Sequence, residues 1–142
     1  MDIHDTSGME KFRSLYTKYY NLADGVLLVY DISDRKSFEE IQNYFLKKIR
    51  EKCKSDIKVI LLGNKTDLEK DRKISLEEGA NFAADNGFMF METSCLENKY
   101  VADSFETLIE LLCRNVIQKY QVFDDNITID RKKNKKKGNC CR

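Results

Sequence analysis

In the segment Val59-Ile60-Leu61-Leu62-Gly63-Asn64-Lys65-Thr66-Asp67, an apolar run passes directly into a polar turn. A run this short and rich in aliphatic residues is typical of a strand buried on both faces of a parallel sheet. Residues 26–30 (Val-Leu-Leu-Val-Tyr) form a second such run, and residues 88–93 (Phe-Met-Phe-Met-Glu-Thr) form a third that follows an Asn-Gly pair. We therefore predict three strands, over 26–30, 59–62 and 88–93.

Amphipathic helical patterns lie between and after these runs. Ser37 is placed to cap one helix, with Glu40 three residues later as in a capping box, and Ser75 stands in the same relation to Glu78. A longer pattern over 101–120 repeats its apolar residues at helical spacing. The apolar residues that share a face of the first helix are Phe38, Ile41, Phe45 and Ile49. This alternation of strands and helices predicts an α/β fold with an open, mostly parallel sheet.

The polar residues that follow the second predicted strand form a candidate ligand site. In an open α/β sheet, ligands bind at the carboxyl ends of the strands. The Asp67 carboxylate can accept two hydrogen bonds side by side, which suits the adjacent ring and exocyclic N–H groups of guanine, and adenine offers no such pair. The Lys65 stem can lie across a flat base, and Asn64 can tie neighbouring loops together. The alternative is a polar turn without a ligand.

Asn64-Lys65-Thr66-Asp67 resembles the Asn-Lys-x-Asp motif by which the Ras-like small GTPases select guanine. The resemblance extends to Glu92-Thr93-Ser94-Cys95, where that family has Glu-Thr-Ser-Ala-Lys. In the family, the backbone N–H at the Ala position meets the guanine carbonyl. The resemblance therefore assigns this contact to Cys95, beside Ser94 in the same loop. Leu96 stands where the family has Lys, so one packing contact beside the base lacks its usual residue.

Asp5-Thr6-Ser7-Gly8 resembles the family's Asp-Thr-Ala-Gly, and flanking segments within residues 10–31 resemble Rab proteins in particular. The resemblance implies that Asp5 orients water on Mg²⁺ and that Gly8 meets the γ-phosphate of GTP. Met9 occupies the usual position of the Gln that orients the attacking water. Because a thioether is a poor substitute, we predict slow hydrolysis and assign no catalytic residue. Tolerated drift in a mobile loop is the alternative.

The sequence contains no Gly-x-x-x-x-Gly-Lys-Ser/Thr motif, the loop whose backbone N–H groups cradle phosphates. The resemblance implies that the family's first two strands and first helix would precede Met1, which falls inside the expected third strand. A truncated gene model or an alternative transcript would explain that start. We expect an N-terminally truncated P-loop NTPase fold with helices on both faces of the sheet. Nucleotide binding should be weak, and an apolar strand edge should lie open along 25–30.

Charge is unevenly distributed along the chain. Residues 131–142 hold seven Lys and Arg and no Asp or Glu, which leaves 18 basic against 24 acidic residues in 1–130. Such a tail suits an anionic membrane or a nucleic acid. No aromatic residue interleaves with its lysines, so we expect no nucleic-acid binding.

The paired Cys140 and Cys141 resemble Rab endings that carry two geranylgeranyl groups. Two such groups form a stable anchor when they are joined to a basic run. The alternative is an unmodified tail.

We expect a partial small-GTPase domain over 1–120 and a flexible basic tail over 121–142. The resemblance implies a Rab-like GTP/GDP-binding switch of vesicle traffic, held by lipid at the cytoplasmic face of intracellular membranes with a cytosolic pool. Its implied partners are guanine nucleotide with Mg²⁺, an exchange factor, a GTPase-activating protein, a prenylation escort and effectors. A lipid-anchored, non-catalytic protein-binding module is the alternative. A zinc protein is disfavoured, because the five cysteines fit no zinc spacing.

Overall fold

The computed structural model describes residues 2–6 and 17–114 of the 142 in the chain. The chain divides into two compact units, Met1–Leu108 and Ile109–Arg142. In the second unit, residues 109–114 are helical, and Arg114 pairs with Glu110 at 3.5 Å. The predicted boundary between domain and tail, at residue 120, lies outside the described residues and stays a prediction.

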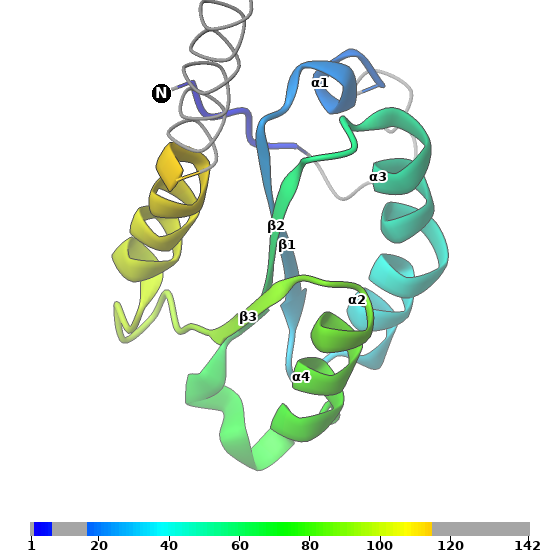
Figure 1. Ribbon diagram of the computed structural model, residues 1–142. Helices are drawn as coiled ribbons and strands as arrows, with labels where there is room; N and C mark the ends of the chain where they lie inside the picture. Colours follow the sequence, from blue (N-terminus) through cyan, green and yellow to red (C-terminus); the bar gives the residue numbers. More distant parts are fainter. Residues whose placement is uncertain (1, 7–16, 115–142) are drawn as a thin grey trace, which may run out of the picture. The chain divides into compact units, whose positions relative to one another are not determined.

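A parallel sheet of three strands forms the centre of the first unit, in the order β1-β2-β3 (Figure 1). The strands are β1 (Gly25–Asp31), β2 (Lys58–Asn64) and β3 (Met89–Glu92). All three predicted strands are therefore confirmed. Residues Val59 to Leu62 of the middle strand are buried, as an apolar run covered on both faces requires.

A nearly continuous helical stretch connects β1 to β2. It consists of α2 (Arg35–Glu40), the π-helical segment η2 (Ile41–Phe45) and α3 (Leu46–Lys52). The prediction that Ser37 caps this helix is wrong, because Asp34 does so. Asp34 has an extended backbone, and its carboxylate accepts the Lys36 N–H at 3.1 Å. Ser37 already lies inside the helix, where its hydroxyl donates to the Asp34 carbonyl at 2.7 Å.

The other helical segments agree better with their sequence signals. α4 (Leu76–Asp85) begins at the predicted cap, where the Ser75 hydroxyl accepts the Glu78 N–H at 3.0 Å. Residues 101–108 are helical in the first unit, and the predicted continuation from 115 to 120 lies outside the described residues. Two short segments were not predicted: α1 (Thr17–Leu22) and the 3₁₀ segment η3 (Thr66–Asp71). No helix in the described part of the chain is long and apolar enough to cross a bilayer.

The main hydrophobic core lies between the sheet and the helices α2, α3 and α4, which share one face of it (Figure 1). Tyr30 of β1 packs against Phe38 of α2 with ring centroids 4.8 Å apart, and Phe38 packs against Phe82 of α4 at 5.4 Å. Adjacent strand residues point to opposite faces. Gly25 accordingly faces away from this core, and a Cβ built there would lie 2.9 Å from Leu108. Helices thus contact both faces, as predicted.

Residues 2–6 do not form the strand that was expected to end near Asp5. They are exposed and belong to no regular element. A strand needs a hydrogen-bonded neighbour, and among the described residues β1 pairs only with β2. The predicted open edge along β1 is therefore present in this part of the chain. Val29 of the same strand, on the face opposite the main core, is 54% exposed.

Candidate functional site

Polar residues from three strand ends meet at one edge of the sheet. The register pairs Asp31 with Asn64 and Gly63 with Glu92, so the carboxyl ends of β1, β2 and β3 lie at the same level. The polar segment that follows β2 therefore sits beside the one that follows β3. The structure brings together five of the predicted site residues here: Asn64, Lys65, Asp67, Ser94 and Cys95.

Lys65 is held by an ion pair across two strand ends. Its ammonium lies 2.7 Å from the Asp31 carboxylate, which also accepts hydrogen bonds from the Ser33 N–H at 2.8 Å and the Ser33 hydroxyl at 2.6 Å. Burial opposes ionisation of Asp31, but the hydrogen bonds from Lys65 and Ser33 outweigh it and hold the pKa of this carboxyl below its usual range. The hydrogen bond to Asp31 raises the pKa of Lys65.

The backbone at Lys65 has a left-handed conformation, with φ 68° and ψ 42°. Few residues other than glycine adopt this conformation, and such strain is found where the surrounding structure fixes a functional segment. The turn that follows is closed by the Leu68 N–H, which donates to the Lys65 carbonyl at 2.9 Å. This conformation lets the chain turn sharply from β2 into η3.

The Asp67 carboxylate is hydrogen-bonded to the loop after β3. The Ser94 hydroxyl donates to Asp67 Oδ1 at 2.5 Å. Two further hydrogen bonds join the same loops: the Thr66 N–H donates to the Thr93 carbonyl at 3.1 Å, and the Thr93 hydroxyl donates to Asn64 Oδ1 at 3.2 Å. Asn64 thus links the two loops, as the sequence predicted, and Asp67 is oriented by a residue of the other loop.

Cys95 lies in the turn that follows Ser94. The backbone groups of Ser94 and Lys99 exchange hydrogen bonds of 3.1 and 2.8 Å, which close the turn. The Cys95 N–H donates to no other residue in the described part of the chain, and the Cys95 thiol is free and exposed. Leu96 is 83% exposed and so does not supply the packing contact that the family's Lys would make.

These groups can recognise a planar base with two adjacent donors and one acceptor. Asp67 Oδ2 carries no hydrogen bond from the residues described, and Oδ1 keeps a second lone pair beside its bond to Ser94. The Cys95 N–H supplies a donor from the neighbouring loop, and the half-exposed Lys65 stem supplies an apolar surface. The arrangement fits guanine in its hydrogen-bonding pattern.

Of the predicted phosphate and metal residues, the structure describes only Asp5. Asp5 is exposed, and no group of three or more His, Cys, Asp or Glu that could hold a metal ion occurs among residues 2–6 and 17–114. One exposed carboxylate does not by itself make a Mg²⁺ site. The other predicted positions, Gly8, Met9, Cys140 and Cys141, lie outside the described residues.

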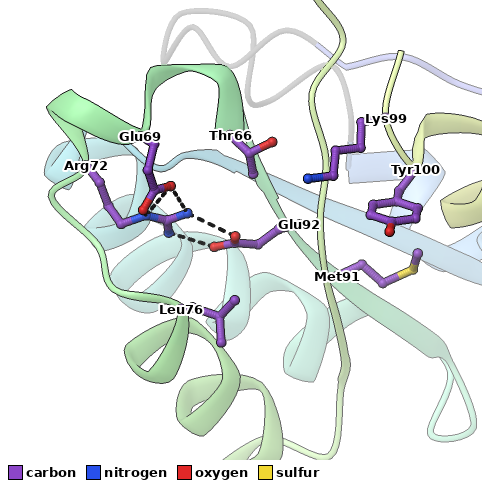
Figure 2. Close-up of a pocket in the computed structure, with 8 residues that line it drawn as sticks. All are labelled: Thr66, Glu69, Arg72, Leu76, Met91, Glu92, Lys99 and Tyr100. Atoms are coloured by element: carbon purple, nitrogen blue, oxygen red, sulfur yellow. Dashed lines mark hydrogen bonds and ion pairs between the residues drawn. The ribbon is translucent and has the colours of Figure 1, made fainter. Parts of the chain in front are cut away.

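An open pocket of about 570 Å³ lies next to the residues predicted to read the base but does not contain them (Figure 2). Of the two predicted motifs, Thr66 and Glu92 line it, and the buried Thr66 hydroxyl has no hydrogen-bond partner among the described residues. Arg72, Glu69 and Glu92 form a side-chain cluster in its wall (Figure 2). No role was predicted for this cluster or for Asp31. The position of Asp31 at a strand end was the one signal that could have singled it out.

Comparison with known proteins agrees with the geometry. A model of the Ras family matches residues 1–114. The Ras-related protein Rab-13 of Canis lupus familiaris is 42% identical over 108 residues, which cover 76% of this chain and 53% of that protein. The Ras-related protein Rab-8A of Bos taurus and of Mus musculus is 44% identical over 108 residues, which cover 76% of this chain and 52% of each. The chain spans about half the length of the curated relatives it matches.

Proposed function

This chain belongs to the Ras family of small GTPases, and from that premise we propose that it carries the guanine-reading half of a Rab-like nucleotide switch. The single observation that supports this most strongly is the 2.5 Å hydrogen bond from Ser94 to Asp67. It joins the two loops that resemble the family's base motifs and leaves oxygen lone pairs of Asp67 available to a ligand.

Each base-reading residue has a separate task in this proposal. Asp67 accepts the ring and exocyclic N–H groups of guanine, and the Cys95 N–H donates to the guanine carbonyl. The Lys65 stem covers one face of the base while its ammonium stays paired with Asp31. Asn64 and Ser94 hold the two loops together and so position the other groups.

Fewer residues are assigned to the phosphate end of the proposed nucleotide. Gly8 would meet the γ-phosphate, and Asp5 would serve Mg²⁺ through a water molecule, as the family resemblance implies. A single exposed carboxylate does not fit a complete Mg²⁺ site, so we derive no step through the metal. Base contacts without a phosphate cradle should bind GTP or GDP weakly.

Hydrolysis of GTP is expected to be slow. The family position that orients the attacking water carries Met9 in this chain, and a thioether is a weak acceptor that cannot donate a hydrogen bond. We therefore assign no catalytic residue. Guanine recognition and hydrolysis are separable in this proposal, because the residues that read the base contribute no group to the attack on phosphate.

We further propose that the chain works at the cytoplasmic face of intracellular membranes in vesicle traffic. Geranylgeranyl groups on Cys140 and Cys141, with the basic run of 131–142, would supply the anchor, and a prenylation escort would maintain a cytosolic pool. An exchange factor, a GTPase-activating protein and effectors would be its partners. The similarity to Rab-8A and Rab-13 supports this assignment at the level of the family.

A lipid-anchored module that binds protein partners without nucleotide control is the second candidate. The presence of Met9 at the position where the family has Gln favours it. The two candidates differ in one measurable property, which is the affinity of the chain for guanine nucleotide.

The test is the binding of fluorescent GDP to the purified chain in Mg²⁺, with Asp67→Ala as the matched control. Binding that is lost in the variant would support guanine recognition by this half-site. A cooperatively folded chain that binds no GDP would contradict it and favour the nucleotide-independent module. Circular dichroism of both proteins separates loss of binding from loss of folding.

A further inference from the structure

Arg72 lies at the carboxyl-terminal end of η3 and bonds to both segments that carry the base-reading groups. Its guanidinium donates to the two oxygens of Glu92 in β3, at 2.7 and 2.9 Å (Figure 2). It also donates to Glu69 within η3, with distances from 2.7 to 2.9 Å, and to the Ile74 carbonyl at 3.0 Å. We call Arg72, Glu69 and Glu92 the Arg72 cluster.

Within the Arg72 cluster, the pair of Arg72 with Glu92 is better protected from water than a surface ion pair, whereas the Glu69 side chain is 66% exposed. The side chains of Arg72 and Glu92 are 16% and 14% exposed. The hydrogen bonds that Arg72 donates to Glu92 and then to Glu69 raise the pKa of Arg72 further above its ordinary value, so the guanidinium stays charged. Two-pronged bonds between a guanidinium and a carboxylate fix both distance and orientation. This geometry makes the cluster a rigid link between η3 and β3.

Such a link is needed because η3 is not a continuous helix. The segment is kinked at Leu68, where φ is −92° and ψ is 34°, directly after Asp67. At its other end it begins from the left-handed residue Lys65. The backbone thus departs from helical geometry at Lys65, two residues before Asp67, and at Leu68, directly after it. The orientation of the Asp67 carboxylate therefore depends on how the two ends of η3 are held.

The two ends of η3 are held by different groups. The Thr66 N–H ties the beginning to the Thr93 carbonyl at 3.1 Å, and Arg72 ties the end to Glu92, which precedes Thr93 in the chain. We propose that Arg72 is a positioning residue that keeps Asp67 of η3 in hydrogen-bonding register with Ser94 of the loop after β3. The expected effect on guanine binding rests on the proposed function, but the alignment of Asp67 with Ser94 does not.

The chain offers a matched control for a purely structural role. Arg35 makes a similar two-pronged pair with Glu78 and donates to the Lys73 carbonyl at 2.8 Å, but it joins α2 to α4. These side chains are 40% and 38% exposed. Arg35→Met removes a guanidinium–carboxylate pair from the same unit and leaves the bonds of Arg72 to Glu69 and Glu92 in place.

The alignment of the two loops is tested by amide hydrogen exchange of the full chain. Exchange is measured by NMR for wild type, Arg72→Met, Arg72→Lys and Arg35→Met. The reporters are the Thr66 N–H, which donates to the Thr93 carbonyl of the other loop, and the Ser94 N–H, which closes the turn after β3. The N–H of Leu61, a fully buried residue of β2, reports overall stability. Arg72→Met should speed exchange of the two loop amides by about tenfold or more relative to Leu61. Arg72→Lys should restore part of the protection, and Arg35→Met should leave the ratio unchanged.

Equal acceleration at all three amides in Arg72→Met, or the same loop effect in Arg35→Met, would overturn the proposal. If Arg72→Met does not fold, Glu92→Gln replaces it in the same measurement, because the amide keeps the shape but loses the charge. Binding of fluorescent GDP provides the second readout: Arg72→Met should weaken it by about tenfold and Arg35→Met should not. A wild-type chain that binds no GDP would contradict the proposed nucleotide function, while the exchange ratios would still decide the role of Arg72.

Discussion

Ser94 and Asp67 stand 27 positions apart in the chain and are joined by a hydrogen bond of 2.5 Å from the serine hydroxyl to the carboxylate. Ser94 is fully buried, and its hydroxyl also accepts the Glu97 N–H at 3.1 Å. The hydroxyl therefore orients Asp67 and shapes the turn that presents the Cys95 N–H. One side chain supports both of the groups proposed to read guanine.

Ser94→Ala should damage both parts of the site at once. The substitution removes two hydrogen bonds, one of them to a charged group, so the free energy of unfolding should fall by about 2 kcal/mol. GDP affinity should fall as well, because Asp67 would lose its fixed orientation. Ser104→Ala is the control, since Ser104 is also buried and its hydroxyl donates to the Val101 carbonyl at 2.7 Å, away from the site. Equal GDP affinity in the two variants would refute this role of Ser94.

Asp67→Asn should change which base is preferred. Guanine presents two adjacent donors, which a carboxylate can accept, whereas an asparagine amide offers one acceptor and one donor. Xanthine has an N–H donor beside a carbonyl acceptor and so matches the amide. In competition binding, the ratio of xanthosine to guanosine diphosphate affinity should rise by at least about tenfold, the worth of one lost bond at a buried polar site. An unchanged ratio would show that Asp67 does not read the base.

The sequence predicted the strands well because each is an unbroken apolar run, and Val59 to Leu62 can be buried only in the middle of a sheet. The positions of the loops proposed to read the base were predicted for a different reason. Their residues follow strand ends directly, and parallel strands place those ends together. That Asn64 would link neighbouring loops could be predicted, but its partner Thr93 could not. The identity of that partner depends on the register of β2 with β3.

What the sequence could not predict depends on side chains far apart in the chain. Arg72 and Glu92 are separated by 20 positions, and nothing in either local segment indicates that they pair. The cap of α2 was predicted wrongly because Ser37 and Asp34 both satisfy the local pattern. The carboxylate closest to the true helix start took the role. Local patterns thus locate elements and loops, while the register between elements selects the contacts.

Acid should weaken the pairing of Asp31 with Lys65. The pKa of Asp31 is held below its ordinary value of 3.8, so its contribution to stability is fully present above that pH and is lost as pH falls through the lower folded value. Urea unfolding between about pH 2 and pH 6 should show wild type losing stability faster than Asp31→Asn in that acid range. Glu69 and Glu78 also have lowered pKa values, so the comparison must be between variants rather than between pH values alone. Parallel curves for the two proteins would refute the assignment.

Tyr30→Phe should stabilise the fold. Tyr30 is 1% exposed, and its hydroxyl has no hydrogen-bond partner among the described residues. Burial, followed by the charge of Glu92, raises the pKa of this hydroxyl, which keeps it neutral in the core. Removing an unsatisfied buried hydroxyl without changing the ring should raise the free energy of unfolding by about 1 kcal/mol, measured by urea denaturation.

Gly79 provides a second test of the same hydroxyl, because a Cβ built there would lie 2.5 Å from the Tyr30 oxygen and 2.8 Å from the Phe90 ring. Gly79→Ala should therefore destabilise the wild-type chain, and less so when Tyr30→Phe is already present. The contact with Phe90 persists in both backgrounds, so the relief should be partial. A double-mutant cycle in urea measures the difference directly. Strict additivity of the two substitutions would mean that the hydroxyl does not fill the space beside Gly79, and a destabilising Tyr30→Phe would mean that the hydroxyl has a partner in solution.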